Sequence, residues 1–334
     1  MTQPYDIVGL GNAIMDVIAP VADDLLIALD IERNAMQLID EERALDLTEA
    51  LGLQGELQEV SGGSAANTIA GMAELGVKAA YLGKVASDDM GARFKAGMNA
   101  SGVKFDGVSD AASPATARSL IAVTPNGDRS MNTFLGISTD FGQDDIDAAL
   151  IKNARLLYME GYLFDKDAAK AAYVHASKLA KDANVKVALT LSDSFCVGRH
   201  RDSFRELVDN HIDILFANED ELLSLYEQTD FDTALALAAK SGTIACVTRG
   251  AAGSVILDGE NRFDIAADPV EKVVDTTGAG DQYAAGVLAG YLKGLDWQAS
   301  GQLGSLCAAE VISHYGARPE KPVKALAAQK GLKL

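Results

Sequence analysis

The sequence has few of the residues that build disulfide-linked or zinc-dependent folds. Among 334 residues it contains three cysteines and four histidines, and the cysteines stand far apart at Cys196, Cys246 and Cys307. An odd number of distant cysteines fits neither a disulfide framework nor a CxxC zinc knuckle. The histidines lack HxxH and HExxH spacing, so they predict no zinc site.

Positive charge and long apolar runs are also scarce. The chain has 29 Lys and Arg against 48 Asp and Glu, a formal net charge of −19, and shows no basic stripe. Because such a charge repels phosphate backbones and anionic lipid, we expect neither nucleic acid nor a membrane as partner. No segment approaches 18 consecutive apolar residues, and the first residues lack the basic and apolar regions of a signal peptide. A cytoplasmic protein is therefore expected.

The composition is that of a folded globular protein, with 48% hydrophobic and 23% charged residues. Apolar runs alternate with helical stretches, which predicts a doubly wound, mainly parallel sheet with helices on both faces. No linker, low-complexity run or internal repeat divides the chain, so residues 1–334 are expected to form one domain. The expected strands are residues 5–10, 79–82, 156–159, 185–191, 212–216 and 243–248.

Two β-rich segments, at about 16–39 and 112–136, do not follow this alternation. They predict a small strand-built lid, discontinuous in sequence, over one end of the sheet. An exposed edge of such a lid can pair between subunits or simply close over substrate, so a monomer and a homodimer are both open.

The strongest chemical signal is Asp275-Thr-Thr-Gly-Ala-Gly-Asp-Gln-Tyr-Ala-Ala-Gly286. Gly278, Ala279 and Gly280 lack bulk where a helix begins, so backbone N–H groups and the helix dipole can bind an anion there. Asp281, which those N–H groups would keep ionised, is placed to take a proton from a hydroxyl beside the same anion. The alternative is a capping residue after an ordinary turn. An almost uncharged, and so buried, helix follows and favours the functional interpretation.

Two segments near the N-terminus carry polar groups that suit a hydroxylated ligand. Ser61-Gly-Gly-Ser-Ala-Ala-Asn67 places a glycine pair before a helix, and Asn67 offers both a donor and an acceptor. Asn12 and Asp16 follow the first strand, where open α/β sheets bind ligands, and a carboxylate can accept two hydrogen bonds from a vicinal diol. Gly9 and Gly11 begin like a dinucleotide fingerprint, but its third glycine is replaced and no convincing helix follows, so a dehydrogenase is disfavoured.

A fourth segment, Ala217-Asn-Glu-Asp-Glu-Leu-Leu223, follows an expected strand. Asn218 and Glu221 share one face of the first helical turn and could hold a hydrated Mg²⁺ beside a phosphate. An acidic first turn that complements the helix dipole is the alternative. Neither a Walker P-loop nor a nucleophile elbow occurs.

Together, the segments at 61–67 and 275–281 resemble the two signatures of the ribokinase-like, or phosphofructokinase B, family of carbohydrate kinases, over essentially the whole chain. The resemblance implies the doubly wound fold with a β lid. It also implies Asp281 as general base and an anion hole at Gly278, Ala279 and Gly280. Arg129 of the lid would reach the phosphates on closure. For the acceptor it implies Asn12, Ile14, Asp16, Gly62, Gly63, Asn67, Met131, Thr133 and Tyr162, and for ATP it implies Asn218, Thr248, Gly250, Thr277, Gly278 and Gly280.

Within that family, Gly-Asn-Ala-Ile-Met-Asp16 and Asn126-Gly-Asp-Arg-Ser-Met131 most resemble the adenosine kinases. This implies transfer of the γ-phosphoryl group of ATP to the primary hydroxyl of adenosine. Mg²⁺ would lie near Asn218 and Glu221, and a monovalent cation such as K⁺ near the carbonyls around Asp275 and Thr277. A kinase of a free sugar such as ribose or fructose is the alternative, and a non-catalytic nucleoside- or sugar-binding protein is the rival from another class.

Overall fold

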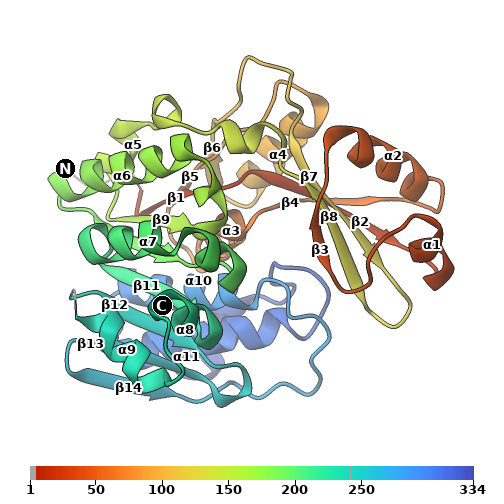
Figure 1. The fold of residues 1–334 in the computed structure, drawn as a ribbon. Coiled ribbons are helices and arrows are strands. Elements are labelled where there is room, and N and C mark those ends of the chain that lie inside the picture. The colour runs from red at the N-terminus through yellow and green to blue at the C-terminus, as the bar shows by residue number, and fades with distance from the viewer. Residues whose placement is uncertain (1–4, 241) are drawn as a thin grey trace.

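The computed structural model describes residues 5–240 and 242–334, which form a large α/β body and a smaller strand-built part beside it (Figure 1). Residues 1–4, within the segment that lacks signal-peptide features, lie outside this range. The body contains one sheet made, in spatial order, of β14 (Asn261–Ile265), β13 (Ser254–Asp258), β12 (Ile244–Thr248), β11 (Ile214–Asn218), β10 (Lys186–Thr190), β9 (Leu156–Glu160), β1 (Ile7–Leu10), β5 (Ala79–Leu82) and β6 (Val103–Phe105).

The strands from β12 to β6 are parallel, and only β13 and β14 at one edge run antiparallel. The predicted mainly parallel sheet is therefore confirmed. After β1 the chain builds β5 and β6 on one side and then crosses to β9 on the other. This reversal at β1 and β9 is a topological switch point, where open α/β sheets leave a ligand-binding crevice at the carboxyl ends of the strands.

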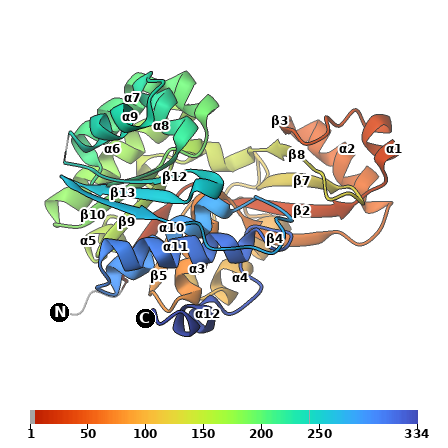
Figure 2. The ribbon, with the colours of Figure 1, turned by 90° about the horizontal axis from the view of Figure 1, so that it is seen from below.

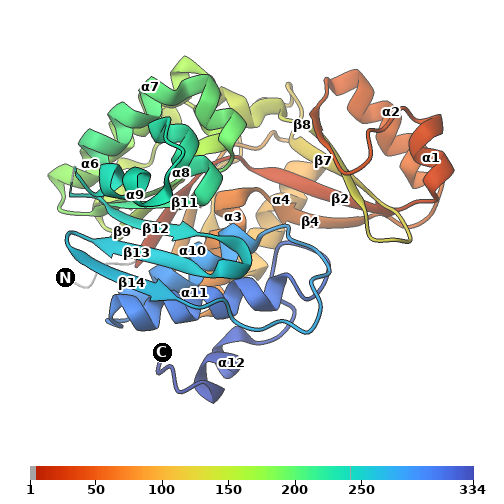
Figure 3. The same ribbon diagram turned by 60° about the horizontal axis from the view of Figure 1, so that its bottom comes forward.

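Helices cover both faces of the sheet (Figures 2 and 3). Strand residues alternate between two cores: Val8 and Leu10 pack on one side and Ile7 on the other. The first side carries α5 (Ala148–Lys152), α6 (Asp167–Asp182), α7 (Ser194–His211), α8 (Glu219–Tyr226) and α9 (Phe231–Ala239). The second carries α3 (Ser64–Glu74), α4 (Asp89–Ala100), α10 (Ala279–Leu292), α11 (Trp297–Val311) and α12 (Val323–Gln329).

The predicted burial of the nearly uncharged helix is confirmed, since α10 is buried along most of its length. Short 3₁₀ helices connect other elements, at η1 (Gly136–Asp140), η2 (Gln143–Asp145), η3 (Gly161–Asp165) and η4 (Gly250–Ala252). In the described part of the chain, no helix combines the length and apolar character needed to cross a membrane.

The smaller part is a five-stranded sheet, which we call the lid, ordered β3 (Met36–Leu38), β8 (Arg129–Phe134), β7 (Ala117–Val123), β2 (Ile14–Pro20) and β4 (Gln58–Gly62). Two helices, α1 (Asp23–Ala28) and α2 (Glu41–Gly52), cover one of its faces through an apolar core. The lid is larger than the two segments predicted for it, because α2 and β4 also belong to it. The sequence of β4, Gln-Glu-Val-Ser-Gly, has a single large apolar residue, so only its backbone pairing with β2 reveals it.

Candidate active site

The N-terminus of α10 has the shape expected of an anion cradle. Gly278 precedes the helix with a left-handed backbone (φ 78°), and a Cβ there would lie 2.6 Å from the Cα of Ala317. Glycine is therefore required both by conformation and by close packing. A Cβ on Gly280, by contrast, would meet no atom within 4 Å among the described residues, so the space in front of this turn is open. The backbone N–H of Thr277 is already bonded to Asp275 Oδ1 at 2.9 Å.

Asp281 lies in the first turn of α10 and is held by side chains of α3. Its Oδ1 accepts from Ser64 Oγ at 2.6 Å, and its Oδ2 accepts from Asn67 Nδ2 at 3.2 Å. Burial raises the pKa of Asp281 to about 6, against the lowering effect of these two bonds. The expectation that backbone N–H groups keep this carboxylate ionised is therefore wrong, because its bonded partners are side chains and desolvation dominates. A carboxylate whose pKa lies near neutrality is well matched to accept a proton.

The glycine pair before α3 allows two chain segments to approach each other. Gly63 has φ 99°, and a Cβ on it would clash with the carbonyl oxygen of Asn12. The neighbouring Gly62 lies beside Asp16, whose carboxylate would clash with a Cβ at that position. The Asn12 carbonyl and the Asp16 carboxylate occupy the space that side chains at these two positions would need. This close approach brings Asp16 near the start of α3, which carries Asn67.

Asn12 lies inside the protein rather than in an open crevice. Its side chain is 2% exposed and accepts from Ser138 Oγ at 3.0 Å, while its backbone N–H donates to Glu160 Oε1 at 2.7 Å. Glu160 Oε2 also accepts from the N–H of Ala65, at 2.6 Å, at the start of α3. Asn12 and Glu160 therefore tie the ends of β1 and β9 to α3, which fixes the position of Asn67. Burial raises the pKa of Glu160 to about 7.

The lid turns one face toward the body and presents Asp16 on it. The register aligns Val60, Asp16, Ser119, Thr133 and Leu38 in one row across the five strands. Burial raises the pKa of Asp16 to about 6, although Arg129 and Arg318 oppose the shift. Ser119 and Thr133 share a hydrogen bond of 2.9 Å within the row.

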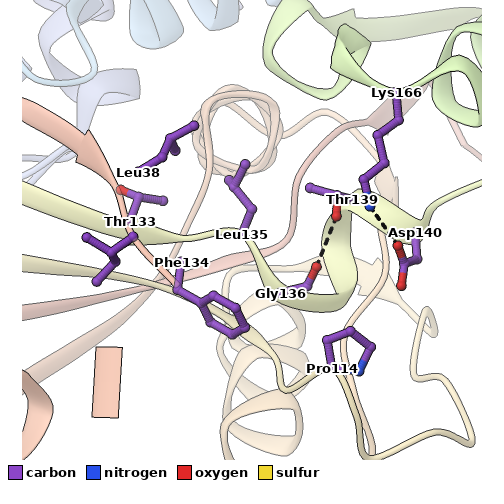
Figure 4. A pocket seen from close by; sticks show the side chains of 10 residues that line it. Leu38, Pro114, Thr133, Phe134, Leu135, Gly136, Thr139, Asp140 and Lys166 are labelled. Carbon is purple, nitrogen blue, oxygen red and sulfur yellow. Dashed lines mark hydrogen bonds and ion pairs between the residues drawn. The ribbon is translucent and has the colours of Figure 1, made fainter. Parts of the chain in front are cut away.

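The apolar end of this lid face lies toward β3. Ile14 lies on the same face, one row nearer the body, and Met131 and Met36 pair one row farther from the body. Met36 and Leu38 are 48% and 57% exposed although they are apolar. A cavity of about 310 Å³ lies between this end and the body. It is lined by Leu38, Pro114, Thr133, Phe134, Leu135, Gly136, Thr139, Asp140 and Lys166, drawn in Figure 4, together with Ile39. Tyr162, 37% exposed, follows β9 and donates to the carbonyl oxygen of Ser192 at 3.2 Å.

Arg129 is already docked against the body. Its guanidinium donates to Asp275 Oδ2 at 2.7 Å, and both side chains are less than 10% exposed. Asp275 Oδ2 also accepts from the N–H of Gly316 at 3.0 Å. The expectation that Arg129 waits for lid closure to reach phosphates therefore does not describe this structure, in which the lid strand β8 is pinned beside the anion cradle. Its Nε, buried and without a hydrogen-bond partner in the described structure, remains a spare donor.

The residues predicted for the nucleotide and for Mg²⁺ follow two adjacent strands. Asn218 ends β11 in register with Thr248, which ends β12, and a Cβ on Gly250 would meet no described atom within 4 Å. Asn218 and Glu221 form a capping box at α8, with Asn218 Nδ2 2.6 Å from Glu221 Oε1. The capping alternative is thus present in the structure, and burial raises the pKa of Glu221 to about 7. The described residues contain no group of three or more His, Cys, Asp or Glu side chains placed to hold a metal ion.

Sequence reasoning missed several residues of this site. Ser64, the first residue of α3 after the cap residue Gly63, had no predicted role, and its hydroxyl donates to Asp281. The side chains of Glu160 and Asp275 had no predicted role, because the burial of an acidic side chain is visible only in three dimensions. Arg318 donates to Asn67 from 251 positions away. No local pattern indicates that contact.

Comparison with known proteins identifies the family. Residues 27–324 match the family described as pfkB family carbohydrate kinase. The chain is 31% identical over 280 residues to an ATP-dependent ribose-1-phosphate kinase of Halopiger xanaduensis, covering 81% of this chain and 86% of that protein. It is 27% identical over 337 residues to the adenosine kinase of Saccharomyces cerevisiae, covering 95% and 96%.

Solved structures share the whole fold. A probable sugar kinase from Rhizobium etli is 44% identical with a TM-score of 0.91, over 100% of both chains. The adenosine kinase from Sinorhizobium meliloti is 44% identical with a TM-score of 0.89, over 98% of this chain and 99% of that one. The ribokinase-like fold and the kinase activity predicted from the sequence are thereby confirmed, and the chain belongs to the pfkB family of carbohydrate kinases.

Proposed function

We propose that this kinase transfers the γ-phosphoryl group of ATP to the primary hydroxyl of a ribonucleoside, with adenosine as the preferred acceptor. The observation that carries the acceptor choice is the row across the lid that joins Asp16 to Leu38. Asp16 offers a carboxylate to the vicinal diol of ribose. Thr133 lies two strands away, about 10 Å, beside exposed apolar side chains and the cavity of Figure 4. A free sugar held at Asp16 leaves that apolar end uncovered, whereas a base attached to the ribose extends along it.

Asp281 is the proposed general base. Ser64 and Asn67 each donate to one of its two oxygens, and these bonds fix the orientation of the carboxylate. The acceptor hydroxyl gives its proton to Asp281 while its oxygen attacks the γ-phosphorus and the bond to the β-phosphate oxygen of ADP breaks. Positioning and charge stabilisation by the N-terminus of α10 supply most of the acceleration expected of phosphoryl transfer.

The nucleotide is proposed to lie along Thr248, Gly250, Thr277 and the turn of Gly278 to Gly280. Kinases of this family use ATP and typically Mg²⁺. Bound Mg²⁺ neutralises charge on the phosphates. Asn218 and Glu221 would contact the water molecules around the ion rather than the ion itself, because both carboxylate oxygens of Glu221 already accept hydrogen bonds from Asn218. A K⁺ ion beside the carbonyls around Asp275 and Thr277 remains a prediction, tested by comparing rates in potassium and choline salts.

The experiment is ADP release measured with purified enzyme, ATP and Mg²⁺ against adenosine, other ribonucleosides, ribose, fructose and ribose 1-phosphate. Asp281→Asn serves as the matched inactive control. We expect adenosine to have the highest kcat/KM. A free sugar with a higher kcat/KM than adenosine would make the protein a sugar kinase. If none of the acceptors in the panel supported ADP release, both assignments would be excluded. Size-exclusion chromatography with light scattering distinguishes monomer from homodimer.

A further inference from the structure

We propose that Arg318 is a positioning residue for the acceptor site: it helps to fix the direction of the Asn67 amide and, with Arg129, supplies positive charge that faces Asp16. The inference rests on the proposed roles of Asp16, Asn67 and Asp281. It adds a residue from a segment that neither signature contains.

The guanidinium of Arg318 contacts four groups from three other elements. Its Nε donates to Asn67 Oδ1 at 3.4 Å, one terminal nitrogen donates to Ser101 Oγ at 3.1 Å, and the other donates to the carbonyl oxygen of Ser61 and lies 3.5 Å from Met98 Sδ. A planar fork with donors in fixed directions can serve these acceptors together, which an ammonium group cannot do.

These contacts decide which end of the Asn67 amide faces the general base. With Oδ1 directed at Arg318, the Nδ2 group must point to Asp281, where it donates at 3.2 Å. Loss of Arg318 removes one of the two hydrogen bonds that hold this orientation and leaves only the bond from Nδ2 to the Asp281 carboxylate. The path from Arg318 to the proton acceptor is therefore only two hydrogen bonds long.

The backbone around Arg318 is fixed to the same helix that carries Asp281. Gln282 Nε2 donates to the carbonyl oxygens of Asn67, at 3.2 Å, and of Ala317, at 3.0 Å. Ala317 also packs against Gly278 at the cradle. This arrangement holds Arg318 at a set distance from both α3 and α10.

Charge gives Arg318 a second effect. Three charged groups face Asp16: Arg129 from β8, Arg318 from the C-terminal segment and Asp281 from α10. Burial lowers the pKa of Arg318 to about 10, which still leaves it charged at neutral pH. Arg318 thus lowers the pKa of Asp16 and keeps it ionised, and an ionised carboxylate is what a diol needs as acceptor.

The test compares Arg318→Gln, which removes the charge, with Arg318→Lys, which keeps it but loses the fork. Arg262→Gln is the control, because Arg262 pairs with Asp232 and Asp264 at the far edge of the sheet. For each enzyme we would measure KM for acceptor and for ATP, kcat/KM for acceptor against pH, and thermal unfolding. The acceptor in these assays is the compound from the substrate panel that the wild-type enzyme uses best. The test of Arg318 therefore does not depend on adenosine being the substrate.

We expect Arg318→Gln to raise the acceptor KM about tenfold or more, with less than about a twofold change in the KM for ATP. The acid limb of its pH profile should move up by about half a pH unit or more. Arg318→Lys should raise the acceptor KM but keep the limb in place. An unchanged acceptor KM and limb in Arg318→Gln would overturn the proposal, as would equal losses for both substrates that track a lower melting temperature. If Arg318→Gln does not fold, Arg318→Lys decides, since wild-type acceptor KM in that variant contradicts the role of the fork.

Discussion

Replacing Asp281 by asparagine removes the proposed proton acceptor while leaving the shape of the site almost unchanged. The new carbonyl oxygen can still accept from Ser64 Oγ, which lies 2.6 Å from Oδ1 in the native protein. The new amide group, however, faces the Nδ2 group of Asn67, and Asn67 cannot flip without turning its amide toward Arg318. Activity should therefore fall through loss of the base, with kcat lower by about 10² to 10⁴-fold.

Stability is expected to change little, because two effects oppose each other. The folded pKa of Asp281 is raised from 3.8 to about 6, so its contribution to stability is present below pH 4 and is lost as pH rises through 6. At pH 7.5 the ionised carboxylate thus costs at most about 3 kcal/mol, which asparagine avoids. The mismatched pair of amide groups destabilises Asp281→Asn by about 1–3 kcal/mol, which offsets what the variant gains by losing the buried charge.

The assay is steady-state ADP release with the best acceptor, alongside thermal unfolding and ATP binding by calorimetry. We expect normal ATP binding and a melting temperature within about 5 °C of wild type. Asn67→Ala is a useful companion, because it disturbs the same carboxylate but leaves the base in place. An Asp281→Asn enzyme that keeps more than a tenth of wild-type kcat would refute the assignment of Asp281 as general base.

Further predictions concern protonation, acceptor binding and the lid. The kcat/KM for acceptor should fall below about pH 6 as Asp16 and Asp281 take up protons, and a flat profile between about pH 5 and 8 would contradict this. Ser64→Ala should move the acid limb of kcat to higher pH, measured in the same buffers, because a bond that favours ionised Asp281 is lost. Asp16→Ala should raise the acceptor KM by about one to two decades, and 2′- or 3′-deoxynucleosides should already be poor substrates of the wild type; equal use of the deoxy and ribo compounds would make Asp16 structural. Arg129→Ala should lower both stability, by about 3–5 kcal/mol, and kcat, and adding Asp275→Asn should cost less than the sum of the two single changes; strict additivity in chemical denaturation would exclude the buried ion pair as the lid anchor.

The fold was predictable because its signals are local. Strand β5 (Ala79–Leu82) lies at the residues predicted for it. Strand β4 was missed because its side chains show no alternation, and its place in the lid depends on backbone pairing with β2. Local sequence pattern cannot report that kind of contact.

The proposed role of Asp281 was also suggested by the sequence, because capping a helix does not require a run of small residues before the acid. The protonation state of Asp281 could not be predicted from the sequence, because its pKa depends on how much water the surrounding lid and helices exclude. The position of Arg129 could not be predicted either. The sequence suggested that it moves with the lid, whereas its guanidinium lies 2.7 Å from Asp275 Oδ2 in the structure.

The sequence by itself determined the α/β architecture, the glycine turn at Gly278 and the acid that follows it, because each depends on residues close to one another in the chain. Tertiary structure alone decided that Ser64 and Asn67 hold Asp281, that Glu160 anchors α3, and that Arg318 stands behind Asn67 from 251 positions away. These contacts join segments distant in sequence, and the desolvation that raises the pKa of Asp16 and Asp281 exists only where those segments meet.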